Sequence, residues 1–373
     1  MAEALKHHYG PEIPRRIATM MRAVHPRFDT RAFLRHALDG YETLELMQRG
    51  AKIADALHAH LPADFPAAVA ILLASLNQPA AANDADKNPI TSFLFLPHTL
   101  FVAQHGLDHF EVSMRAQHAL TQRFSAEFSI RKFIQQKQID TLQVLKVWAT
   151  DPSAHVRRLV SEGTRPRLPW APRVRAFQQD PRPVLALLEL LKDDPSLYVR
   201  RSVANNLNDI GKDHPELLFA TVERWLRNAS DNRQWIVRHA LRSAVKRGEQ
   251  GALRVLGFGD AAKVNINNAN VSPTQVNQGA TVQVSFDMVN TTPRAQRLVV
   301  DLCVHFIKAN GSARPKVFKL REIELGARAV ASFSKRLSLK DLTTRKHYPG
   351  VHRVEVVVNG RAMPVAAFEL VAR

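Results

Sequence analysis

An eight-residue string occurs twice in this chain of 373 residues, and the spacing of its copies constrains the fold more than any other feature. DPSAHVRR at residues 151–158 returns as DPSLYVRR at residues 194–201, and a looser third copy runs from Asp231 to His239. In the first two copies, Asp followed by Pro predicts the start of a helix with Asp as its N-cap. The next Val is predicted to face a core, and the Arg pair to leave it.

These copies lie 43 residues apart, from Asp151 to Asp194, and each supplies one amphipathic helix. A period near forty is typical of stacked helix pairs of the HEAT type, which wrap a concave surface. The sequence therefore predicts an all-α HEAT-like repeat solenoid for this part of the chain.

The hydrophobic period changes once along the chain. Helical spacing holds from about Ala2 to Val255, but from Val264 onward apolar residues alternate, as in the run 297–306. Asn-Gly pairs at 310–311 and 359–360 predict tight turns, and the alternating segments amount to six or seven strands. We therefore predict a multidomain chain, with a HEAT-like domain at 1–258 and a small all-β immunoglobulin-like sandwich at 259–373. The stretch Gly248–Asp260 is predicted to be the linker.

The charge balance indicates a polyanionic partner. Lys and Arg number 52 against 34 Asp and Glu, a formal net charge of +18. Nucleic acid and anionic membrane both attract such a chain. Nucleic acid is the better choice, because the apolar run Ala67–Leu76 is too short to span a bilayer and Met1–Pro14 lacks an apolar signal core. One cysteine, Cys303, fits a reducing cytoplasm, and the 16 histidines show no metal-ligand spacing, so we expect no metal.

Aligning the copies predicts a shared stripe on neighbouring helices, which are expected to end at Gly163 and Gly211. Arg158 and Glu162 occupy it in the first copy, Asp209 in the second, in line with Arg201 and Asn205, and the third copy adds His239, Ser243 and Arg247. Both acids lie in a last helical turn, where the dipole disfavours them by roughly 0.3–1 kcal/mol. This placement indicates a site that receives a cation, and removing either acid is expected to leave stability equal or higher. The alternative is an ordinary Arg158–Glu162 surface pair and a local turn between Asp209 and Lys212.

Residues 165–172 form a predicted inter-repeat loop with three prolines and Trp170. A tryptophan held on such a loop either stacks on a sugar or base or fills the gap between repeats. Basic residues of the repeats and of a C-terminal turn are the candidate phosphate contacts: Arg157, Arg158, Arg165, Arg200, Arg201, Arg238, Arg247, Arg345 and Lys346.

Four strings resemble one known family. FSAEFSIR at 124–131, VRRLVSEGTRPRLPWA at 156–171 and YVRRSVANNLNDI at 198–210 are similar to AlkC, a bacterial DNA alkylation-repair glycosylase related to AlkD. KDLTTRKHYPG at 340–350 resembles the immunoglobulin-like domain that many AlkC proteins carry. The likeness extends over nearly the whole chain.

The resemblance implies a monofunctional glycosylase, and we expect a monomer that needs no cofactor. It would release 3-methyladenine and 3-methylcytosine from double-stranded DNA without turning the base into a deep pocket. Carried onto matching positions, the site residues are Glu162, Asp209, Trp170 and Glu127, and the role of Glu127 depends on the resemblance alone. Either Glu162 or Asp209 is expected to position the attacking water. Two alternatives stay open: a non-catalytic HEAT-repeat DNA-binding or scaffold protein, and a solenoid that binds an acidic protein.

Overall fold

The computed structural model describes residues 8–77, 91–259, 262–342 and 345–371. They form two compact units: one contains the residues up to His214 with Asn228–Ala240, and the other contains Pro215–Arg227 with the residues from Leu241 onward. The helices are α1 (Glu12–Val24), α2 (Thr30–Leu38), η2 (Tyr41–Thr43), α3 (Leu46–His60), α4 (Phe65–Ser75), η3 (Thr91–Phe95), α6 (Leu96–His105), α7 (Phe110–Leu120), α8 (Glu127–Gln136), α9 (Gln138–Trp148), α10 (Ala154–Gly163), α11 (Arg175–Gln179), α12 (Arg182–Leu191), α13 (Leu197–Ile210), α14 (Pro215–Leu226), α15 (Asp231–Lys246) and α16 (Gln250–Val255).

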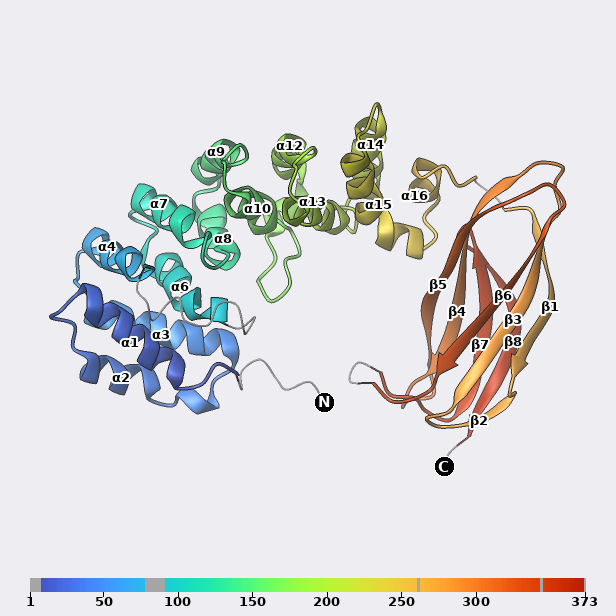
Figure 1. Ribbon diagram of the computed structural model, residues 1–373, viewed down its shortest axis with the longest axis horizontal. Coiled ribbons are helices and arrows are strands. Elements are labelled where there is room, and N and C mark those ends of the chain that lie inside the picture. Colours follow the sequence, from blue (N-terminus) through green and yellow to red (C-terminus); the bar gives the residue numbers. More distant parts are fainter. Residues whose placement is uncertain (1–7, 78–90, 260–261, 343–344, 372–373) are drawn as a thin grey trace. The chain divides into compact units, whose positions relative to one another are not determined.

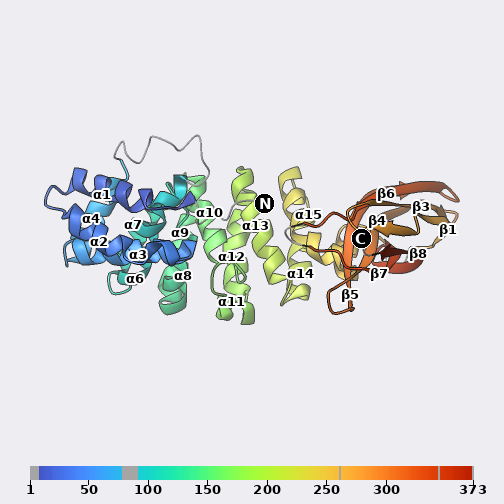
Figure 2. The same cartoon turned by 90° about the horizontal axis from the view of Figure 1, so that it is seen from below.

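The first unit is a HEAT-like array of helix pairs, as the repeat predicts. In Figure 1, α7, α9 and α12 lie in one layer and α8, α10 and α13 in a second layer, and Figure 2 gives the same order along the array from below. Contacts join α10 to both α8 and α13. The apolar faces of α10 and α13 are buried, including the predicted core residues Val156 and Val199. In this layer α10 therefore lies between α8 and α13 and contacts both.

The two repeat helices begin later than predicted. Their N-caps are Ser153 and Ser196 rather than the aspartates of the repeated string. Asp151 accepts a hydrogen bond from the Ser153 amide at 2.8 Å, and Asp194 does the same for Ser196. Each aspartate thus makes an Asx turn before the helix, which competes with its use as the cap.

The apolar run near residue 70, which is too short to span a bilayer, forms a buried helix. It forms α4, which buries Phe65, Ala68, Val69 and Leu72. Within the described ranges, no helix combines the length and the apolarity that crossing a bilayer requires.

The strands of the second unit form an immunoglobulin-like sandwich of two sheets (Figure 1). One sheet has the order β1-β3-β6 and the other β2-β8-β7-β4-β5. The strands are β1 (Val264–Ser272), β2 (Gln275–Asn277), β3 (Thr281–Asn290), β4 (Gln296–Ile307), β5 (Ala313–Leu325), β6 (Val330–Ser338), β7 (Gly350–Val358) and β8 (Arg361–Val371). Alternation along β4 is as predicted, since Leu298, Val300, Leu302, Val304 and Phe306 are all buried in the core.

The predicted linker is an ordered part of this second unit as far as residue 259, and Asp260 lies outside the described residues. It contains α16, whose Leu253 forms a small cluster with Phe258 and with Val299 on β4. Gly248 faces Gly360 of the β7–β8 turn so closely that a Cβ on Gly248 would lie 2.6 Å from the Gly360 Cα. The short helix therefore packs on the sandwich, and the domain boundary at residue 258 stays a prediction.

Candidate active site

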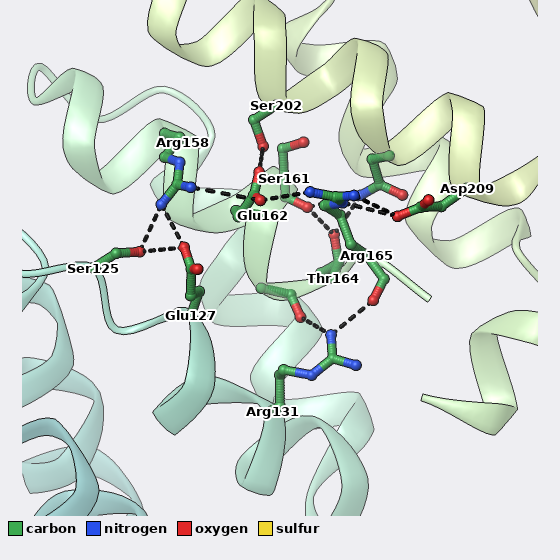
Figure 3. A network of polar contacts seen from close by, with 12 residues as sticks. Ser125, Glu127, Arg131, Arg158, Ser161, Glu162, Thr164, Arg165, Ser202 and Asp209 are labelled. Atoms are coloured by element: carbon green, nitrogen blue, oxygen red, sulfur yellow. Dashed lines mark hydrogen bonds and ion pairs between the residues drawn. The ribbon is translucent and has the colours of Figure 1, made fainter. Parts of the chain in front are cut away.

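The three predicted acids come from three neighbouring helices. Glu127 is the first residue of α8, Glu162 is the second-last of α10 and Asp209 is the second-last of α13. Gly163 allows the end of α10 to approach α8, because a Cβ there would lie 2.5 Å from Ile130 Cγ2. Figure 3 shows that the carboxylates belong to one continuous polar network.

Arg158 joins two of these acids. Its Nη1 donates to Glu127 Oε2 at 2.5 Å and to Ser125 Oγ at 2.7 Å, and its Nη2 lies 3.5 Å from Glu162 Oε1. Burial lowers the pKa of Arg158, but Glu127 and Glu162 outweigh this and leave the pKa above its usual value. The guanidinium also stacks over the Tyr198 ring at 5.0 Å. Arg158 is therefore a fixed cation between two carboxylates.

Arg165 joins Glu162 to the third acid. Its Nη1 donates to Glu162 Oε1 at 2.7 Å, while its Nε donates to Asp209 Oδ2 at 2.8 Å. Lys212 binds the other Asp209 oxygen at 2.8 Å, and Ser202 donates to Glu162 Oε2 at 2.6 Å. Both ordinary contacts that the sequence offered as an alternative, Arg158 with Glu162 and Lys212 with Asp209, are thus present. They are nevertheless not surface pairs, since Glu162 is 6% exposed and Asp209 only 1%.

This geometry changes the expectation for stability. The unfavourable helix dipole at Asp209 is opposed by two cations, Arg165 and Lys212, in a buried position. Removing a buried hydrogen bond to a charged group costs about 1.5–3 kcal/mol, which exceeds the roughly 0.3–1 kcal/mol gained from the dipole. Neutralising Asp209 is therefore expected to lower stability, contrary to the estimate from the sequence.

Arg131 holds the proline-bearing loop that follows α10. This buried arginine donates to the carbonyl oxygens of Gly163, Arg165 and Pro172 at 3.1, 2.7 and 2.5 Å. Burial, followed by the charge of Arg165, lowers the pKa of Arg131 to about 10. Further along the loop, Arg167 Nε binds Asp213 at 2.9 Å. The loop is thus anchored at both sides of its tip.

Trp170 lies at that tip. Its backbone has a φ of +62°, a left-handed conformation that is uncommon for a bulky residue, and its side chain is 66% exposed. A tryptophan so exposed does not fill a gap between repeats, and strained backbone is concentrated at functional sites. This exposure favours the first of the two roles considered for Trp170, which is stacking on a sugar or base.

A pocket of about 460 Å³ opens beside the network. Glu127, Glu162, Arg158 and Trp170 line it, whereas Asp209 does not. Much of the remaining wall is aromatic: Phe93, Phe124, Phe128 and Tyr198. Carboxylate oxygens and aromatic faces in one cavity suit a ligand that carries positive charge.

The sequence reasoning did not single out four polar residues of this site: Ser125, Arg131, Tyr198 and Ser202. Ser125 and Arg131 lie within the string 124–131, and Tyr198 and Ser202 within 198–210, so the resemblance contained them without assigning roles. Ser202 lies 40 residues from Glu162, and no local pattern reports such a contact.

The candidate phosphate contacts fall into three groups. Arg158 and Arg165 bind carboxylates of the site. Arg157 is bidentate to Asp194, at 2.6 and 3.1 Å, and Arg200 donates to the Asp194 and Pro195 carbonyls. The third group is not bound to the acids of the site. Arg201, Arg238 and Lys346 are exposed. Arg247 pairs with Glu249, and Arg345 lies over the Phe306 ring.

A pair of variants distinguishes Arg157, which binds Asp194, from the exposed arginines that are candidates for binding phosphate. Arg157→Ala leaves the buried Asp194 carboxylate without its ion-pair partner, so we expect the free energy of unfolding to fall by about 3 kcal/mol. Arg201→Ala, the matched surface change, is expected to stay within about 0.5 kcal/mol. Urea unfolding measures the free energy of unfolding of both variants, and affinity for duplex DNA over a salt series measures what each arginine contributes to binding DNA. An Arg157→Ala protein of full stability and poor affinity would contradict this division.

Comparisons with known proteins give consistent matches for the helical part and for the strand-rich part of the chain. The family described as "DNA alkylation repair enzyme" matches residues 121–244, and "Uncharacterised protein YhaZ, C-terminal Ig-like domain" matches 265–372. "Uncharacterized protein YhaZ" of Bacillus subtilis is 34% identical over 370 residues, covering 98% of this chain and 99% of that protein.

Among solved structures, the chain is similar to the Pseudomonas fluorescens alkylpurine DNA glycosylase AlkC bound to DNA containing an abasic site analog. The two share 42% identity and a TM-score of 0.90 over 99% of this chain and 100% of that chain. The matched segment 121–244 contains Glu127, Glu162 and Asp209. The chain therefore belongs to the AlkC-type family, in which a DNA alkylation repair enzyme domain is followed by an immunoglobulin-like domain of the YhaZ type.

Proposed function

We propose that the protein is a monofunctional DNA glycosylase that hydrolyses the N-glycosidic bond of cationic N3-alkylated bases in duplex DNA. The observation that carries the proposal is the meeting of Glu127, Glu162 and Trp170 in one pocket of an AlkC-type helical domain. The AlkC structure in the comparison is described as an alkylpurine DNA glycosylase and holds DNA with an abasic site analog, which supports it further.

The chemistry fits the donors and acceptors of the pocket. Alkylation at N3 gives the base a positive charge, so the base leaves with little help from a general acid. Cleavage builds oxocarbenium character on the deoxyribose, which carboxylates stabilise in a site sheltered from water. The protein must also direct a water to the anomeric carbon, and a carboxylate accepts its proton.

Hydrogen bonding suggests how the acids divide this work. Glu162 uses both oxygens, Oε1 with Arg165 and Oε2 with Ser202. Glu127 uses Oε2 for Ser125 and Arg158, and among the described residues no hydrogen bond to its Oε1 is found. We assign the water to Glu127, in place of the Glu162 or Asp209 that the sequence suggested. Glu162 is assigned to stabilising the sugar cation, and Asp209, which lies outside the pocket, to holding Arg165.

Selectivity for charged lesions follows from the same arrangement. The guanidinium donors of Arg158 and Arg165 bind the acids, so they are not available to read the hydrogen-bonding edge of a neutral base. The pocket offers carboxylate and aromatic surface instead, and both attract a cation. The exposure of Trp170 on its anchored loop supports a role in stacking on the sugar or base. The base therefore need not turn into a deep pocket.

Incubation with alkylated duplex DNA without added metal tests the proposal, with the released bases identified by chromatography. We expect 3-methyladenine and 3-methylcytosine to be released, and uracil and hypoxanthine to be retained. 7-Methylguanine is the matched control, because it is cationic but carries its methyl group in the major groove, and we expect slow release or none. Efficient release of uracil would overturn the proposal, and binding without release of any base would indicate the non-catalytic alternative.

A further inference from the structure

Three metal-binding side chains meet on the five-stranded sheet, far from the acids of the helical unit in sequence. They are Cys303 and His305 on β4 and Glu355 on β7. Residues two apart on a strand share a face, and Cys303 is the direct cross-strand partner of Glu355. All three therefore point from the same side of the sheet, opposite to the core-facing Leu302 and Val304.

The ligand atoms lie close to the spacing that a tetrahedral ion imposes. Cys303 Sγ is 3.9 Å from His305 Nε2, which is 2.9 Å from Glu355 Oε2, and all three atoms lie within 4.8 Å of one another. Zinc bonds of about 2.0–2.3 Å at the tetrahedral angle place neighbouring ligand atoms about 3.5 Å apart. Small rotations of the side chains would bring all three to one ion.

The chemistry of the three donor groups limits which metal ions can bind. Calcium and magnesium prefer oxygen ligands, so a thiolate with an imidazole and one carboxylate selects against them. Zinc accepts sulfur, nitrogen and oxygen together, and three protein ligands leave a fourth position for water. The side chains of His305 and Glu355 are 19% and 25% exposed, which gives an ion access from solvent.

A second observation is a carboxylate oxygen on this face that lacks a hydrogen-bond partner among the described residues, although the cations Lys319 and Lys246 lie near its side chain. Asp301 lies on the same face, two residues before Cys303 and 7% exposed, and its Oδ1 has no hydrogen-bond partner in the described part of the chain. A buried carboxylate oxygen without a partner is costly, and a nearby divalent cation lowers that cost.

We propose that Cys303, His305 and Glu355 bind one zinc ion on the outer face of the sandwich, with water as the fourth ligand. Such an ion would link β4 to β7 and stabilise the domain in its folded form. The sequence predicted no metal because its histidines show no metal-ligand spacing. Glu355 is 50 residues from His305, and only the pairing of β4 with β7 brings it to the Cys-x-His pair.

Cobalt(II) titration of the reduced, chelator-treated full-length protein tests this site. Because Cys303 is the single cysteine, a thiolate-to-cobalt charge-transfer band can arise from this residue alone. We expect one cobalt per chain to give the band together with tetrahedral d–d absorption, zinc to displace it, and added zinc to raise the unfolding temperature. Histidines elsewhere that bind metal adventitiously give no such band.

Variants define the other ligands. Cys303→Ser is expected to abolish the band, and Glu355→Gln and His305→Gln to weaken binding at least about 10²-fold, since loss of an outer-shell partner alone costs 10–100-fold. Glu322→Gln, an exposed acid on β5, is the matched control and should bind as the wild type does. Circular dichroism checks that each variant is folded. Absence of the band at micromolar cobalt, or equal affinity in Glu355→Gln and Glu322→Gln, would overturn the proposal, whatever the outcome of the base-release assay.

Discussion

Affinity for duplex DNA is expected to fall by roughly 10³–10⁵-fold between about 50 and 200 mM salt, with little preference for sequence. The physical reason is counterion release: a protein that neutralises Z phosphates loses affinity with a log–log slope of about −0.9Z, and six to ten contacts give this range. The formal net charge of +18 supplies enough cations for such a surface.

The contacts within the protein indicate which arginines contribute to that slope. Arg157, Arg158 and Arg165 are already paired with carboxylates, so their removal should leave the slope unchanged. Arg201 and Arg238 are exposed, and replacing either by Ala is expected to reduce the slope by about one. Fluorescence anisotropy with a labelled duplex over a salt series measures both effects. A flat response to salt would leave the basic excess without a role in binding DNA.

Local patterns predicted the architecture because each element follows from short-range spacing. The 43-residue repeat gave the helix pairs around Val156 and Val199, and alternation gave the core face of β4 from Leu298 to Phe306. The Asn359-Gly360 pair lies at the β7–β8 turn, with left-handed φ values of +45° and +78°. The residues that decide each repeat helix, the core face of β4 and the turn lie within a single short string, and the repeat adds only that one such string returns.

Pairings across the repeats escaped the sequence analysis. Asp194 caps no helix but makes an Asx turn and binds Arg157 of the preceding repeat, 37 residues away. Arg131 reaches three carbonyls of the loop that carries Trp170. The helical period correctly set Glu162 and Asp209 at the ends of adjacent helices, but it could not reveal that Arg165 lies between them. Such contacts depend on how one helix packs on the next, and no short string encodes them.

Glu127→Gln and Glu162→Gln are each expected to reduce the rate of 3-methyladenine release by on the order of 10²-fold or more. Glutamine keeps the shape of the side chain but removes the charge that stabilises the sugar cation and accepts the proton of the water. Affinity for duplex DNA should be unchanged or improved, because a carboxylate near phosphates is repulsive. Single-turnover release and binding to the same duplex measure the two quantities separately. Release by both variants at the wild-type rate would return these acids to the role of ordinary ion pairs for Arg158.

Asp209→Asn is the control that distinguishes a positioning residue from one that faces the lesion. The side chain is 1% exposed and lies outside the pocket, so its contribution passes through Arg165 and Lys212. We expect a loss of about 1–3 kcal/mol of stability together with reduced base release, because Arg165 loses one of its two carboxylates and its hold on Glu162 changes. Asp209→Glu retains the charge and should recover much of the stability. An Asp209→Asn protein of full stability whose release falls as far as that of Glu127→Gln would show instead that Asp209 acts on the lesion directly.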